Sequence, residues 1–97
     1  MKVYFTEQAA DDLESITAYL VARSPVGATS VQLAMQSTFT QLTAFPYLGR
    51  AQTIPGLLKL GVTRYPYNVY YTVDEVADEV VIITVRHTSR APEFYDA

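Results

Sequence analysis

The stretch VVIITV at residues 80–85 is almost wholly apolar and is rich in β-branched side chains. A short apolar run of this kind is typical of a strand that is buried on both faces of a sheet. We therefore expect residues 80–85 to form a central strand, with the other elements of the fold arranged around it.

Three further segments predict neighbouring strands. Alternating apolar residues at 58–62 and a Tyr- and Val-rich segment at 65–73 have the pattern of strands. The polar sequence DEVADE at 74–79 is typical of a turn, so these two strands and the central one should form an antiparallel meander. Residues 2–5, KVYF, predict a strand that joins the same sheet.

Between residues 6 and 45 the apolar residues twice show helical spacing. Thr6 can cap a first helix, which the sequence SPVG at 24–27 ends, and a second helix is expected at 28–44. Because the break is short, the two helices should form an antiparallel hairpin. The positions that should face the core are Ala9, Leu13, Ile16 and Leu20 in the first helix and Val31, Met35, Thr38, Leu42 and Phe45 in the second.

These elements predict an α+β fold: an N-terminal strand, an antiparallel helical hairpin and then a three-stranded antiparallel meander, all strands in one sheet. At 97 residues the chain has the length of a single domain, which we expect to span residues 1–97. The N-terminus has no long apolar core, and no apolar run approaches the roughly 18 residues of a membrane helix. We therefore expect a cytoplasmic protein that does not enter a membrane.

The composition excludes several classes of site. Cysteine is absent, which excludes disulfides, a cysteine nucleophile and thiolate metal sites. His87 is the single histidine, so we expect no metal and no other cofactor. Lys and Arg number 7 against 10 Asp and Glu, and the net charge of -3 argues against a broad nucleic-acid footprint and against direct, specific DNA binding by this chain.

The charges are unevenly distributed along the chain. Acidic residues cluster at the start of the first helix and in the turn at 74–79, whereas residues 50–71 contain none. We expect Lys59, Arg64 and Arg86 to converge on one surface of the sheet, where they would meet phosphate or an acidic partner. The alternative is that they are solvated charges at strand ends. The basic residues of this half are Arg50, Lys59, Arg64, Arg86, His87 and Arg90.

Two other patterns bear on surfaces. Alternation along residues 65–73 places Tyr65, Tyr67 and Tyr71 on one face and Tyr70 on the other, mostly as packing residues. The second predicted helix carries no charge between residues 28 and 45. Its polar side is either an ordinary surface or one that a partner covers.

Four segments, in order, resemble motifs of the RelE/ParE toxin superfamily. AADDLESITAYL at 9–20 resembles the first-helix pattern A-x-x-D-L-x-x-I-x-x-Y, and FPYLGR at 45–50 resembles the P-x-L-G-R loop. RYPYNVYYTV at 64–73 resembles the strand R-Y-x-x-x-Y-x-V, and VRHTSR at 85–90 resembles the ending V-x-H-x-x-R. The chain is identified as a member of this superfamily, and its loop and ending look more like those of the ParE-like branch.

The resemblance implies the toxin of a bacterial type II toxin–antitoxin module, of the kind that stabilises plasmids, with a helical hairpin on an antiparallel sheet. It also implies a cognate antitoxin that forms a hetero-oligomer with the toxin. An extended or helical antitoxin segment would cover the neutral helix surface, and its acidic residues would meet the basic residues of the sheet.

The family divides in its target. ParE-like members poison DNA gyrase, whereas RelE-like members cut messenger RNA on the ribosome without a metal ion. Leu58 stands where family members often have Arg. The RelE-type pattern places an Arg two or three residues past the last strand's valine, near Thr88, where this chain has none, and both departures weaken the nuclease interpretation. We therefore expect a gyrase inhibitor. The alternatives are a ribosome-dependent endoribonuclease and a non-toxic partner in an autorepressor complex.

The candidate site residues follow from these alternatives. Asp11 and Asp12 are expected to be helix-start charges rather than a catalytic pair, and Arg50 to stabilise the fold or pair with an acid. The candidates for partner binding are Lys59, Arg64, Arg86 and Arg90. If the protein is a nuclease, the candidates for acid, base and phosphate contact are His87, Arg64, Arg86, Arg90 and Tyr95.

Overall fold

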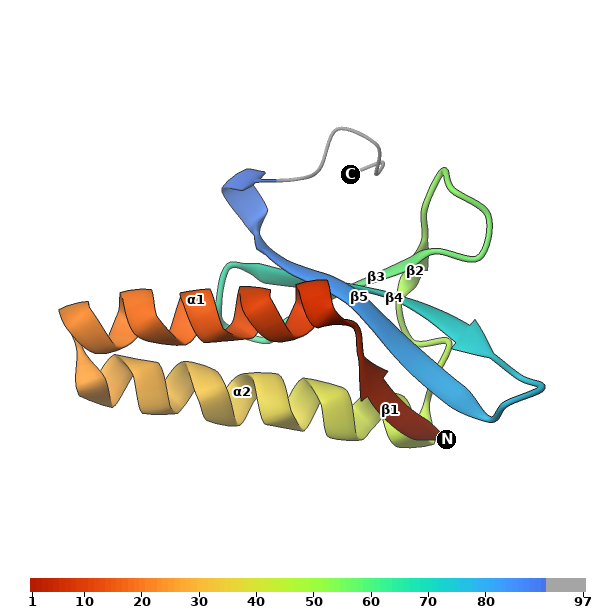
Figure 1. Cartoon of the computed structure of the whole chain (residues 1–97), viewed down its shortest axis with the longest axis horizontal. Helices are drawn as coiled ribbons and strands as arrows, with labels where there is room; N and C mark the ends of the chain where they lie inside the picture. Colours follow the sequence, from red (N-terminus) through yellow and green to blue (C-terminus); the bar gives the residue numbers. More distant parts are fainter. Residues whose placement is uncertain (91–97) are drawn as a thin grey trace.

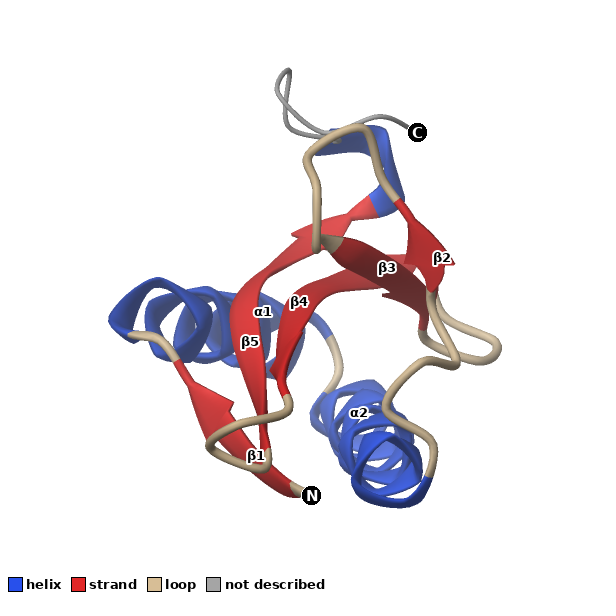
Figure 2. Cartoon of the chain, turned by 90° about the vertical axis from the view of Figure 1, so that its right-hand side faces the viewer, coloured by secondary structure: helices blue, strands red, loops and turns tan. Residues whose placement is uncertain are grey.

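Two antiparallel helices pack against one face of a five-stranded sheet (Figures 1 and 2). In a computed structural model, which describes residues 1–90, the strand order is β1-β5-β4-β3-β2. β1 runs parallel to β5, and the other neighbouring strands are antiparallel, so the α+β fold is confirmed. The elements are β1 (Lys2–Phe5), α1 (Glu7–Arg23), α2 (Pro25–Ala44), β2 (Arg50–Ala51), β3 (Leu58–Gly61), β4 (Tyr67–Asp74), β5 (Glu79–His87) and a short 3-10 helix (Thr88–Arg90).

The apolar run at 80–85 forms the middle of β5, a central strand as predicted, which lies between β1 and β4. Val80, Ile82 and Val85 have exposed fractions of 2% or less and belong to the core. Val81 and Ile83 are only half-buried: Val81 lies on the face that the helices do not cover, and Ile83 has no pairing partner in β4. The prediction of burial on both faces is therefore wrong for these two residues.

Capping side chains set the bounds of both helices. Thr6 caps α1 as predicted, its Oγ1 accepting the Ala9 N–H at 3.1 Å. Ser24 ends α1 and also caps α2, its Oγ accepting the Gly27 N–H at 3.1 Å, and Pro25 suits the first turn that follows. The second helix therefore begins three residues before the predicted start at 28. Within residues 1–90, neither helix is long and apolar enough to cross a membrane.

Two strand bounds differ from the prediction. β4 begins at Tyr67 rather than at residue 65, because the preceding residues form the turn after β3, in which Arg64 has a φ of 75°. β2 spans only two residues, which is too short to show a sequence period, and it was not predicted.

The core lies between the helices and the sheet, and the predicted helix faces are confirmed with one exception. Phe45 continues the spacing of α2 but is its C-cap residue and is 65% exposed. Tyr67 and Tyr71 lie in the core and Tyr65 packs against it, as alternation predicts. The fully or largely buried residues of the core are Ala9, Val31, Met35, Leu42, Val62, Tyr67, Val69, Tyr71, Val80, Ile82 and Val85.

Candidate functional site

The sheet face opposite the helical layer carries basic side chains from three strands. One row across β2, β3, β4 and β5 consists of Arg50, Lys59, Tyr70 and Thr84. A neighbouring row on the same face consists of Gly61, Asn68 and Arg86. The alternate rows point into the core, because successive side chains of a strand project to opposite faces. We call Arg50, Lys59 and Arg86 the basic face.

The predicted convergence of basic residues is therefore found for Lys59 and Arg86, which are both half-buried on this face. Their strands are separated by β4, which corresponds to about 10 Å between the backbones. Arg64 is exposed in the turn before β4, and Arg90 is exposed in the 3-10 helix. The Thr88 N–H donates to the Pro66 carbonyl at 2.8 Å. The turn that contains Arg64 and the 3-10 helix that contains Arg90 therefore lie at the same end of the sheet. Tyr95 lies outside the described residues.

His87 lies on the other face of the sheet from Arg86. It pairs with Tyr67, a core residue, and the two rings meet edge to face at 5.4 Å and 85°. His87 Nδ1 accepts the Ser89 N–H at 3.1 Å and lies 2.8 Å from Ser89 Oγ. The only histidine of the chain is thus not brought together with Lys59 and Arg86.

A β-bulge shapes the end of β5. Ile83 is the extra residue, since Ile82 and Thr84 pair with successive residues of β4. β1 ends opposite Ile82, and beyond this point α1 packs along β5 (Figure 1). Thr6 Oγ1 donates to the Ile83 carbonyl at 2.8 Å. At this edge of the central strand, a backbone carbonyl therefore finds its hydrogen-bond partner at the start of α1 rather than in another strand.

Asp12 connects α1 to this edge and to Arg86. Its Oδ2 accepts the Thr84 hydroxyl and, at 3.1 Å, the Val85 N–H, while Oδ1 accepts Gln8 Nε2 at 2.8 Å. Thr84 Oγ1 in turn accepts Arg86 Nε at 3.1 Å. Asp12 was expected to be only a helix-start charge, and the structure shows that its carboxylate also binds β5.

Gly49 fixes the loop between α2 and β2. A Cβ at this position would lie 2.7 Å from Tyr71 Oη and 2.8 Å from the Lys59 carbonyl, so no side chain fits. The Gly49 N–H donates to Tyr71 Oη at 2.9 Å. Burial raises the pKa of the Tyr71 phenol, and the bond from Gly49 partly offsets this rise. This close approach sets Arg50 opposite Lys59 at the edge of the basic face.

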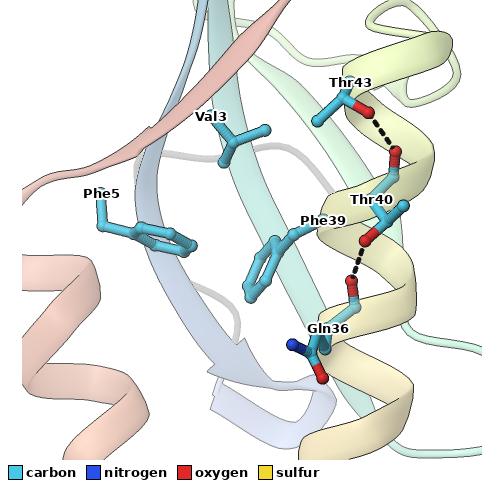
Figure 3. A pocket seen from close by; sticks show the side chains of 6 residues that line it. All are labelled: Val3, Phe5, Gln36, Phe39, Thr40 and Thr43. Carbon is cyan, nitrogen blue, oxygen red and sulfur yellow. Dashed lines mark hydrogen bonds between the residues drawn. The ribbon is translucent and has the colours of Figure 1, made fainter.

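An apolar groove lies on the opposite side, along α2. It consists of two adjoining hollows of about 290 and 420 Å³ that share Gln36 and Phe39. Phe5 and Phe39 pack edge to face at 4.9 Å in the first hollow (Figure 3). The hydroxyls of Thr40 and Thr43 donate to carbonyls of α2, so these protons are not offered to a partner. The groove is lined by Val3, Phe5, Leu13, Thr17, Gln32, Met35, Gln36, Phe39, Thr40 and Thr43.

The groove residues of α2 belong to the charge-free segment that the sequence singled out. Phe5 is 44% exposed, although it is a large apolar side chain. As for metal ions, no three His, Asp or Glu side chains of residues 1–90 gather closely enough to hold one. The two surfaces of interest are therefore the basic face and the apolar groove.

Comparisons with known proteins agree with this architecture. The sequence profile of the family described as ParE toxin of type II toxin-antitoxin system, parDE, matches residues 3–92. No curated protein matches the sequence at a significant level.

Among solved structures, the chain is similar to the chromosomal ParDE system from P. aeruginosa, with a TM-score of 0.76 and 24% identity over 90% of this chain and 95% of that chain. It is also similar to the intact E. coli RelBE complex, with a TM-score of 0.70 and 15% identity over 89% and 94% of the two chains. For the RelBE2 complex from Mycobacterium tuberculosis the TM-score is 0.62, with 25% identity over 89% and 95%. The fold is thus that of the RelE/ParE superfamily, and the chain belongs to the ParE toxin family of type II toxin–antitoxin systems.

Proposed function

We propose that this toxin inhibits DNA gyrase by protein–protein contact through the basic face, and that a cognate antitoxin neutralises it. The observation that carries the proposal is that Lys59 and Arg86 share one sheet face while His87 lies on the other. Inhibition by contact requires a surface of complementary charge, which the basic face offers to an acidic patch of the target. It requires no acid–base pair.

The separation of His87 from Lys59 and Arg86 argues against a nuclease site on the basic face. Metal-independent RNA cleavage needs a base for the 2′-hydroxyl, an acid for the leaving oxygen and cations on the phosphate, all around one point. His87 Nδ1 accepts from Ser89, and its ring packs on Tyr67 at the core side of β5. The proton-transfer candidate therefore faces away from Lys59 and Arg86, which favours gyrase over messenger RNA as the target.

We further propose that an amphipathic segment of the antitoxin fills the apolar groove. The groove is apolar and uncharged, so binding there would depend on burial of apolar surface, as for a helix docked in a groove. The ParDE and RelBE structures to which the chain is similar are toxin–antitoxin systems, which supports an antitoxin partner. The basic face and the groove lie on different sides of the molecule, so the two interactions can be tested separately.

A supercoiling assay with purified gyrase tests the target. We expect the wild-type chain to inhibit supercoiling at micromolar concentration and the double variant Lys59→Ala/Arg86→Ala to inhibit at least about tenfold more weakly, because each lost charged donor costs on the order of 1.5 kcal/mol. Lys2→Ala is the matched control, since Lys2 is exposed and lies opposite Glu79, at the other end of β5 from Arg86. Gyrase that is unaffected by the wild-type chain would refute the proposal.

Expression without antitoxin separates the alternatives in cells. DNA damage with filamentation is the result expected for gyrase poisoning. Rapid translation arrest with cleaved messages would instead assign the chain to the ribosome-dependent endoribonucleases. Normal growth would contradict both toxic functions and leave the role in an autorepressor complex.

A further inference from the structure

We propose that Asp12 and Thr84 are positioning residues that hold the Arg86 guanidinium in one orientation, so that its terminal nitrogens face a carboxylate group of the target. The inference rests on the proposed function of the basic face and extends it to two residues that do not themselves touch the partner. Two hydrogen bonds link α1, β5 and the Arg86 side chain.

The direction of each hydrogen bond in this chain is fixed by chemistry. Arg86 Nε can only donate, and the Asp12 carboxylate can only accept. The single proton of the Thr84 hydroxyl therefore goes to Asp12 Oδ2, and a lone pair of the same oxygen accepts Arg86 Nε at 3.1 Å. Both bonds involve a charged group, which makes them stronger than bonds between neutral groups. The Thr84 hydroxyl thus links the negative charge of Asp12 to the positive charge of Arg86 through two hydrogen bonds.

The surroundings keep this arrangement in place. Thr84 is 2% exposed, so water does not compete freely for its hydroxyl. Asp12 is held in turn by the Val85 N–H at 3.1 Å and by Gln8 Nε2 at 2.8 Å. The bulge at Ile83 is what brings the Val85 N–H and the Thr84 side chain to the same carboxylate. Three hydrogen bonds within the chain therefore hold the carboxylate before any partner arrives.

The use of Nε has a specific consequence for recognition. It leaves the paired Nη groups of Arg86 as the donors for an external anion, in the fork geometry that matches a carboxylate or phosphate. A free arginine loses much of its rotamer freedom when it binds, whereas Arg86 has already lost part of it in the fold. Arg86 is therefore preorganised, and its affinity for an anion depends on Thr84.

Substitutions at Thr84 can distinguish a role in positioning Arg86 from a general role in folding. Thr84→Val keeps the shape of the side chain and the bond from the Val85 N–H to Asp12, but it removes the link to Arg86. Thr84→Ser keeps the hydroxyl and is the conservative rescue variant. Should Thr84→Val fail to fold, Asp12→Asn weakens the same link, because a neutral amide accepts the hydroxyl proton less strongly than a carboxylate.

Two measurements on the full chain test the proposal. In a gyrase supercoiling assay, Thr84→Val is expected to inhibit about tenfold more weakly than wild type, and Thr84→Ser within about twofold of it. In an Arg86→Ala background, Thr84→Val is expected to cause no further loss, because it acts through Arg86. In nitrogen-15 NMR spectra, the Arg86 Nε–H signal is expected to be dispersed and protected from exchange in wild type and in Thr84→Ser, but not in Thr84→Val.

The outcomes distinguish this inference from the proposed function. An Arg86 Nε–H signal that is as protected in Thr84→Val as in wild type would overturn the inference, even if the wild-type chain inhibits gyrase. Full inhibition by Arg86→Ala, or an equal loss from Thr84→Val with and without Arg86, would also overturn it. If the wild-type chain leaves gyrase unaffected, the proposed function fails, and the NMR comparison alone then decides whether Thr84 positions Arg86.

Discussion

Arg86 and His87 are adjacent in the sequence, yet their side chains lie on opposite faces of the sheet. Arg86 pairs with Asn68 on the basic face, and His87 pairs with Tyr67 on the face that the helices cover. This follows from the length of β5, which continues to His87 and keeps the strand alternation through both residues. The two residues therefore cannot share one reaction centre without a change in the strand.

The first prediction concerns this separation. We expect His87→Ala to retain gyrase inhibition within about twofold, since the imidazole does not lie on the basic face. Loss of the ring contact with Tyr67 should lower the free energy of unfolding by about 0.5–1.5 kcal/mol. Supercoiling assays and urea unfolding measure the two effects. A His87→Ala variant that is stable but non-toxic would restore His87 as a candidate catalytic residue.

The second prediction concerns the loop before β2. Gly49→Ala should lower the free energy of unfolding by about 1–3 kcal/mol, because its Cβ would overlap the Lys59 carbonyl, which is backbone and cannot turn aside. Gly61→Ala is the matched control: its Cβ would be 3.7 Å from Asn68 Oδ1, an ordinary contact. Urea unfolding of both variants measures the difference in the free energy of unfolding. Equal values would show that Gly49 does not lie in close contact with β3 and β4 in solution.

The third prediction concerns alkaline pH. Burial holds the pKa of Tyr71 above its ordinary value of 10.0, so the unfolded chain loses this proton at a lower pH than the folded protein does. The contribution of Tyr71 to the free energy of unfolding is fully present below pH 10.0 and is lost as the pH rises through the folded-state pKa. Tyr67, whose pKa burial also raises, acts in the same direction. The melting temperature of Tyr71→Phe should therefore fall less steeply above pH 10.0 than that of wild type. Parallel curves would contradict this assignment.

The fourth prediction concerns the apolar groove. Gln36→Lys should weaken binding of the cognate antitoxin by at least about tenfold, because the new charge would be buried without a partner. Gln41→Lys makes the same change on an exposed part of α2 outside the groove and should leave the affinity unchanged. Titration calorimetry with the antitoxin measures both, and neither variant should alter gyrase inhibition. Equal affinities for the two variants would remove the groove from the antitoxin interface.

Much of the fold could be predicted because it is encoded in short segments. The spacing of apolar residues and the capping groups Thr6 and Ser24 define two helices, and the run at 80–85 marks the central strand. The prediction was less accurate where local signals overlap. Pro25 looks like a helix breaker but suits the first turn of α2, and the strand expected to end at 85 extends to His87 through its pairing with β4.

The candidate surfaces were predicted in part. The convergence of Lys59 and Arg86 on one face agrees with the prediction, because both lie on strands with a regular alternation. The linkage from Asp12 through Thr84 to Arg86 could not be predicted, since Asp12 and Thr84 are 72 positions apart. Sequence patterns relate residues only a few positions apart, so they do not indicate a contact between residues this far apart in the chain.

The sequence by itself determined which segments become the two helices and the strands other than β2, their order, and the absence of charge along α2, since these properties depend on residues a few positions apart. Only the tertiary structure decided that β1 runs parallel to β5, that the bulge at Ile83 directs Thr84 and Val85 to Asp12, and that Gly49 lies against Tyr71. These features arise when distant segments are packed together, and their energies exist only in the complete fold. The faces on which Arg86 and His87 lie, and hence the proposed function, depend on that packing.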